Sequence, residues 1–143
     1  GTQFLFPGDA SAEESEELAS HILSIAEETV PAGFRHVSSE DNPLISMFCF
    51  ENAEDEQITV KYVNLEDISG KIIIDTENAE VIRQTISGQE VMIVYKDYAP
   101  GSAQPDTMYQ IVWICKEQQY WIAVEGSNVA LEELLPLVES LIV

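Results

Sequence analysis

The chain has 143 residues, 45% of them hydrophobic, which is enough for one domain with a real core and too apolar for a disordered chain. Its 26 Asp and Glu against 6 Lys and Arg give a formal net charge of -20. Such a surface repels phosphate backbones and anionic headgroups, so nucleic acid and direct binding to anionic membranes are disfavoured. A solvated acidic surface explains the charge most simply. A cationic partner, weak divalent-cation binding or a saline environment are the alternatives.

The N-terminus predicts a processed chain. Because the sequence starts at Gly1 rather than Met, we expect residues 1–10 to be a linker or tag scar, and any membrane anchor to have been removed. The remaining residues, 11–143, are expected to form a single domain.

The first predicted element is an amphipathic helix over residues 11–29, closed by Pro31. Ser11-Ala12-Glu13-Glu14 matches a capping box, which predicts that the helix begins there. The apolar positions with helical spacing are Leu18, Ile22, Ile25 and Ala26.

The pattern then changes to that of strands. The predicted strands are Leu44–Phe50, Gln57–Val63, Lys71–Asp75, Val81–Ile86, Glu90–Lys96, Tyr109–Cys115 and Tyr120–Val124. Ser87-Gly88-Gln89 and Lys116–Gln119 are predicted turns, and Asp97–Thr107 is a predicted loop. Because Tyr109–Cys115 is apolar on both faces, we expect it to be central and covered twice.

A second helix is predicted by the spacing of the apolar residues after Gly126, and Pro136 inside it predicts a kink, break or restart near 132–136. Together these elements predict an α+β fold. We expect one curved antiparallel sheet of six to seven strands, with an N-terminal and a C-terminal helix packed on one face.

The two cysteines, Cys49 and Cys115, lie in separate apolar strands and lack metal-site or C-x-x-C spacing. We interpret them as buried free thiols, with a disulfide as the alternative if the chain matures outside the cytoplasm. Neither has the basic surroundings of a nucleophilic thiol.

No sequence motif indicates catalysis, a metal or a cofactor. His21 and His36 are interpreted as ordinary histidines, since no nucleophile motif accompanies them. The acidic clusters Glu54-Asp55-Glu56 and Glu66-Asp67 are expected to flank exposed turns, with weak calcium binding as the alternative. Abundant carboxylates alone do not indicate an acid–base pair.

Aromatic residues are concentrated in the predicted strands. Core packing is the plainest interpretation, and an apolar groove for a lipid or peptide is the alternative. The residues concerned are Phe48, Phe50, Tyr62, Tyr95, Trp113, Tyr120 and Trp121.

Several motifs, in this order, resemble an uncharacterised bacterial family of unknown function. They are Pro31-Ala32-Gly33-Phe34 (P-x-G-F), Asp75–Glu80 (D-T-x-x-A-E), Ile86–Val91 (I-N-G-x-x-G, without the second Gly), Ile111–Ile122 (paired Trp and Tyr) and Leu131–Leu141 (E-E-L-L then E-S-L). The resemblance covers residues 31–142 and leaves the helix over 11–30 outside.

The resemblance implies an extracytoplasmic domain of Gram-positive lipoproteins and anti-sigma-factor-like membrane proteins. It also implies a distant likeness to the half-barrels of lipoprotein carriers and sigma-factor regulators. It brings no catalytic residues or cofactors with it.

Three functions remain open. The leading hypothesis is a non-catalytic extracytoplasmic binding or sensory domain for a protein or small apolar ligand, held at the membrane only through a removed N-terminal anchor. A carboxylate-based hydrolase would need two facing acids, at least one of them buried. A structural spacer is the third.

Overall fold

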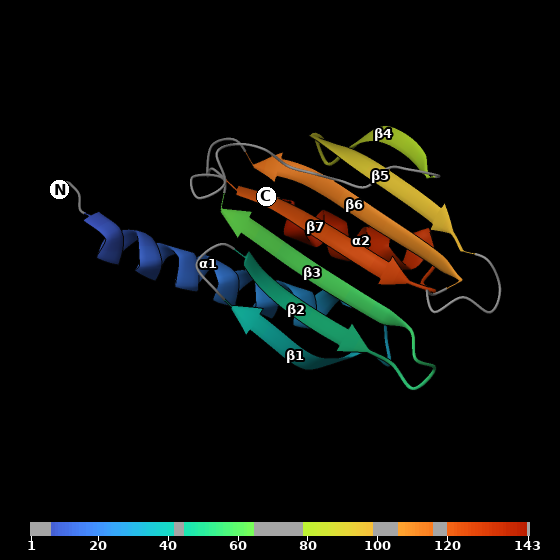
Figure 1. Cartoon of the computed structure of the whole chain (residues 1–143), viewed down its shortest axis with the longest axis horizontal. Helices are drawn as coiled ribbons and strands as arrows, with labels where there is room; N and C mark the ends of the chain where they lie inside the picture. Colours follow the sequence, from blue (N-terminus) through green and yellow to red (C-terminus); the bar gives the residue numbers. More distant parts are fainter. Residues whose placement is uncertain (1–6, 42–44, 65–78, 99–105, 116–119, 143) are drawn as a thin grey trace.

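The computed structural model describes residues 7–41, 45–64, 79–98, 106–115 and 120–142, and shows an open α+β fold (Figure 1). The described residues form seven antiparallel strands in the order β1-β2-β3-β7-β6-β5-β4. The strands are β1 (Arg35–Asp41), β2 (Ile45–Glu51), β3 (Gln57–Asn64), β4 (Glu80–Ile86), β5 (Gln89–Asp97), β6 (Thr107–Cys115) and β7 (Tyr120–Ser127). The predicted fold class is thereby confirmed.

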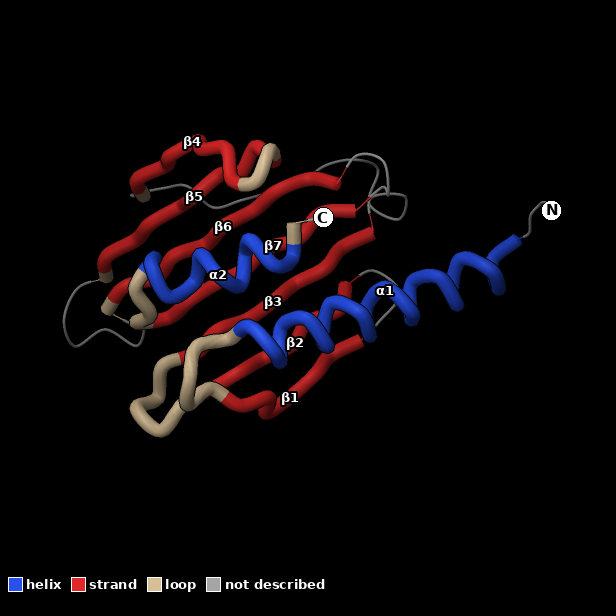
Figure 2. Tube along the Cα trace, turned by 180° about the vertical axis from the view of Figure 1, so that it is seen from behind, coloured by secondary structure: helices blue, strands red, loops and turns tan. Residues whose placement is uncertain are grey.

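Two helices, α1 (Pro7–Thr29) and α2 (Leu131–Leu141), lie on the same face of this sheet (Figure 2). Their buried residues join the apolar side chains of the strands in one core. The helical members are Ala19, Ile22 and Ala26 of α1 and Leu134, Leu137, Val138 and Leu141 of α2. Neither described helix combines the length and apolarity needed to cross a bilayer.

Helix α1 begins earlier than predicted. It starts at Pro7, so the supposed capping box at Ser11–Glu14 lies inside the helix, and residues 7–10 are helical rather than linker. Proline suits the first helical turn, because its fixed φ matches the helix and its missing N–H has no partner there.

Helix α2 is continuous through Pro136, so two of the three alternatives predicted there, a break and a restart, are wrong. Pro136 is exposed, whereas Leu134 and Leu137 beside it are fully buried. Because this face of α2 points to solvent, water can satisfy the Glu132 carbonyl that loses its helical donor.

Six predicted strands are confirmed within a few residues, but the sequence pattern missed β1. Its residues 35–40 are all exposed and mostly polar, since β1 is an edge strand held by its pairing with β2. Of the other predictions, Lys71–Asp75, Lys116–Gln119 and Leu44 lie outside the described residues.

The hairpin between β4 and β5 is confirmed. Ser87 and Gly88 have φ values of 50° and 82°, as a two-residue turn of type I′ requires, and Ile86 pairs with Gln89 across it.

Candidate functional site

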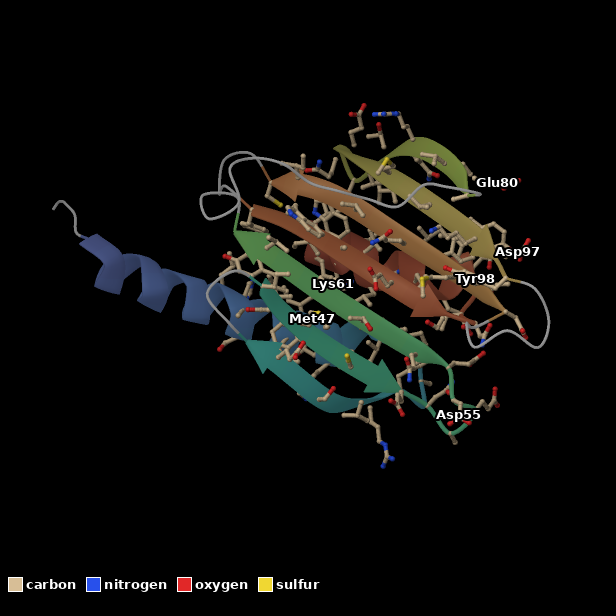
Figure 3. The ribbon with its side chains drawn as sticks, in the orientation of Figure 1. Met47, Asp55, Lys61, Glu80, Asp97 and Tyr98 are labelled. Atoms are coloured by element: carbon tan, nitrogen blue, oxygen red, sulfur yellow. The ribbon has the colours of Figure 1, made fainter. Side chains whose placement is uncertain are left out.

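Strand alternation gives the sheet two chemically different faces. One carries the core beneath the helices, and no described element covers the other, which we call the helix-free face. Register places these central residues on the helix-free face: Met47, Cys49, Thr59, Lys61, Val63, Met92, Val94, Gln110, Val112, Ile114, Trp121, Ala123 and Glu125. Figure 3 shows Met47 and Lys61 on this side.

The helix-free face is apolar through much of its area. All three methionines of the sequence, Met47, Met92 and Met108, lie on it. Ile114 remains 38% exposed, whereas Val112 beside it is buried, so the prediction that both faces of this strand are covered holds only in part. Flexible methionine side chains adapt to irregular partner surfaces, which is why they recur in binding sites.

The charges of this face balance, although the chain as a whole is strongly acidic. Strand register and alternation place on it every Lys and Arg that the structure describes: Arg35, Lys61, Arg83 and Lys96. The same rule places four acidic strand residues there: Glu40, Glu51, Glu90 and Glu125. Four positive and four negative charges leave this face with no net charge. It therefore repels an acidic partner less than the rest of the strongly acidic chain does.

A small polar network lies in the middle of the helix-free face. Lys61 Nζ and Gln110 Nε2 each donate to Glu125 Oε2 at 2.8 Å, from the strands on either side of β7. The Lys61 and Glu125 side chains are 28% and 16% exposed. A partly exposed ion pair contributes at most about 1 kcal/mol to stability. The network therefore mainly fixes the position of a carboxylate.

Trp121, beside Ile114 on this face, has an unusual polar group. Its indole Nε1 is buried and has no hydrogen-bond partner among the residues that the structure describes. A buried N–H without an acceptor costs about 1–3 kcal/mol. A rearrangement that supplied an acceptor would recover that free energy.

The predicted aromatic set is divided between the two faces. Five members are buried in the helix-covered core: Phe48, Phe50, Tyr62, Trp113 and Tyr120. The Tyr62 and Tyr120 rings pack with centroids 5.0 Å apart. These five residues fill the core and so do not line an open groove. Tyr95 stacks on Tyr109 at 4.7 Å, and Trp121 alone lies on the helix-free face.

A family model described as a domain of unknown function, DUF4367, matches residues 25–141. The chain belongs to the DUF4367 family. Comparisons with curated proteins and with solved structures found no match. The DUF4367 match begins in α1, slightly before the predicted boundary at residue 31, and ends with α2. It therefore includes every described strand and the helix-free face that they form.

The two cysteines of this DUF4367 domain lie far apart in the sheet. Cys49 on β2 and Cys115 on β6 are both free and half-buried. Strands β3 and β7 lie between them, so three strand spacings of about 4.8 Å put them roughly 14 Å apart, beyond the ~7 Å that a disulfide spans. Burial raises the pKa of the Cys115 thiol, and its contacts with Tyr120 and Trp113 offset this only partly. Cys115 is therefore poorly suited as a nucleophile.

Neither of the two histidines, His21 and His36, is gathered with acids among the described residues. His36 is exposed on β1, where its Nε2 lies 2.7 Å from Ser39 Oγ and its ring packs 5.4 Å from that of Phe50. His21 is exposed on α1. Among the residues whose burial is described, Ser46 is the one buried polar residue.

The acidic cluster Glu54-Asp55-Glu56 forms an exposed turn, as predicted. Asn52 organises it, since its Oδ1 accepts the backbone N–H groups of Glu54 and Glu56 at 3.0 Å each. Among the described residues, no three His, Cys, Asp or Glu side chains come together as a metal site. The second cluster, Glu66-Asp67, lies outside the described residues.

The sequence reasoning missed the methionines and the basic residues of the helix-free face. Within each predicted strand, alternation already separates Met92 from Ile93 and Lys61 from Tyr62. Strand order was the missing information, because only the neighbouring strands show that these residues share one surface.

Proposed function

We propose that this DUF4367 domain is a non-catalytic binding or sensory domain that contacts a polypeptide partner through its helix-free face. The observation that carries the proposal is the charge-balanced, methionine-bearing sheet face on a chain of net charge -20. Methionines recur at adaptable binding surfaces, and Ile114 on this face is 38% exposed.

The central polar network favours a polypeptide over a lipid tail. An acyl chain would bury the Lys61–Glu125 pair and offer no hydrogen bonds in return, which is costly for charged groups. A polypeptide brings its own amides and side chains, which can bond to the remaining lone pairs of Glu125.

We place the domain outside the cytoplasmic membrane, in an anchored or exported protein. The support is the resemblance of its motifs to extracytoplasmic domains. A fusion of the full-length protein to alkaline phosphatase, which is active only after export, tests this. Active fusions are expected, and inactive but stable fusions would contradict the location.

A site-specific photocrosslinker tests the binding face. We would introduce benzoylphenylalanine at Ile114, on the helix-free face, and at Ser140, which is exposed on α2 as the matched control. Irradiation of cells making the full-length protein should give a discrete protein adduct from position 114 and none from position 140. In addition, Lys61→Glu should reduce the adduct several-fold while the fold, checked by circular dichroism, persists.

Three other outcomes of the crosslinking experiment would contradict the proposal. Equal adducts from both positions would show non-specific contact. No protein adduct from position 114 would favour a structural spacer. Adducts to lipid alone would replace the polypeptide with an apolar ligand.

A further inference from the structure

The two edges of the sheet are very different. At β1 the edge is protected by a register shift between His36 and Ser38 and by acidic residues at its end. At β4 the ladder with β5 is unbroken, with seven consecutive pairs from Glu80–Tyr95 to Ile86–Gln89. Bulges and like charges discourage strand addition, so β1 is blunted whereas β4 is not.

Strand β4 is also open to solvent and partly apolar. Six of its seven residues are exposed. Val81 and Ile82 are 43% and 49% exposed, and alternation puts them on opposite faces. The two charges of the strand, Glu80 and Arg83, cancel. Strand β4 therefore has none of the bulges, prolines or like charges that protect an edge.

Within the described residues no strand pairs with the outer edge of β4, so its backbone presents a regular set of groups at that edge. In a type I′ hairpin the residues that flank the turn, Ile86 and Gln89, form a hydrogen-bonded pair. Counting back by alternation, Val81, Arg83 and Thr85 direct their N–H and C=O groups away from β5, toward the free edge. A second strand can bond to all three.

We propose that β4 accepts an extended segment of another protein, added antiparallel as an eighth strand. Antiparallel addition continues the pattern of every neighbouring pair in the described sheet. Directly opposite residues should then complement one another, with an acid facing Arg83, apolar residues facing Ile82 and Val81, and a base facing Glu80. Read from its N-terminus, the segment has the pattern acidic–apolar–apolar–basic.

A second copy of this chain fits the edge poorly. Two copies paired antiparallel through β4 would be related by a two-fold axis normal to the sheet. Each residue of β4 would then lie opposite a residue on the same face of the sheet. Glu80 and Arg83 lie on opposite faces and cannot meet across such an axis. Two chains of charge -20 also repel each other, which favours a different protein as the source of the strand.

This edge borders the helix-free face, on which Arg83 lies, but strand addition uses the backbone of β4, so the inference does not rest on the function proposed above. The test uses two end-blocked, dye-labelled peptides of the same composition, Thr-Glu-Val-Ile-Lys-Thr and its reversal, Thr-Lys-Ile-Val-Glu-Thr. Anisotropy titration should show the first binding at least ~10-fold more tightly. Arg83→Glu should weaken it by a similar factor, and a peptide with Lys in place of Glu should restore binding.

Arg35→Glu, an identical charge change on the other edge strand, is the matched control and should leave the affinity unchanged. Failure of both peptides to bind at millimolar concentration would overturn the proposal, as would equal affinities or indifference to Arg83→Glu. Tighter binding of the reversed peptide would show parallel addition. A dimer in sedimentation that is lost with Ile82→Lys would assign the edge to a second copy.

Discussion

Tyr95 and Asp97 are coupled by a hydrogen bond at the outer part of the sheet, where the Tyr95 hydroxyl donates to Asp97 Oδ1 at 2.5 Å. This bond favours the protonated phenol, and burial and the negative carboxylate add to it, raising the pKa of Tyr95 to about 12. Between the ordinary value of 10 and this value, the folded chain holds a proton that the unfolded chain releases. The pair therefore stabilises the fold fully below pH 10 and loses that contribution as the pH rises toward 12.

Asp97→Ala should bring the pKa of Tyr95 back toward 10, because the acceptor and its charge are both removed. Ultraviolet titration of tyrosinate measures this, and Tyr95→Phe identifies the step that belongs to Tyr95. Glu139→Ala, which removes an exposed acid on α2, is the control. A titration that is the same in Asp97→Ala and the parent would refute the coupling.

Gly126 lets helix α2 approach strand β7 closely. A Cβ atom at this position would lie 2.8 Å from Leu134 Cδ1 and 3.2 Å from Val129 Cβ. Leu134 is fully buried and has little room to move. Gly126→Ala should therefore destabilise the fold by about 1–3 kcal/mol, as overpacking does.

Urea unfolding measures the effect of Gly126→Ala, with Ser127→Ala, on the opposite face of the same strand, as the control. A double variant that also carries Leu134→Val should lose less stability than the sum of the two single changes, because the clash is relieved. If Gly126→Ala unfolded at the parent's urea concentration, the close approach would not limit the side chain.

The elements that the sequence revealed are those whose residues face a core. Gln57–Val63 alternates because one side of β3 is buried, and the turn at Ser87-Gly88 requires positive φ. The exposed edge strand β1 carries no such pattern, so only its pairing with β2 identifies it. The start of α1 was misplaced because the capping sequence at Ser11–Glu14 also suits a helix interior, and helix position depends on packing.

At the scale of the whole molecule, the fold class followed from local patterns but the candidate site did not. Alternation within one strand assigns residues to two sides without saying which strands are neighbours. The charge balance of the helix-free face includes Arg35 on one edge strand and Arg83 on the other, with five strands between them. Such a property exists only once the strand order is known.

The uneven distribution of charge also sets how the fold responds to salt. The helix-free face balances its charges, so the excess that makes the chain -20 lies outside that face, and these like charges repel in the compact state. Raising NaCl from about 0.01 M to 0.15 M shortens the screening length from about 30 Å to 8 Å. If screening removes about 1 kcal/mol of repulsion, Tm should rise by roughly 3–5 °C. Because KCl at equal ionic strength screens equally, it should give the same rise. A fall in Tm with either salt would mean that attractive pairs such as Lys61–Glu125 outweigh the repulsion.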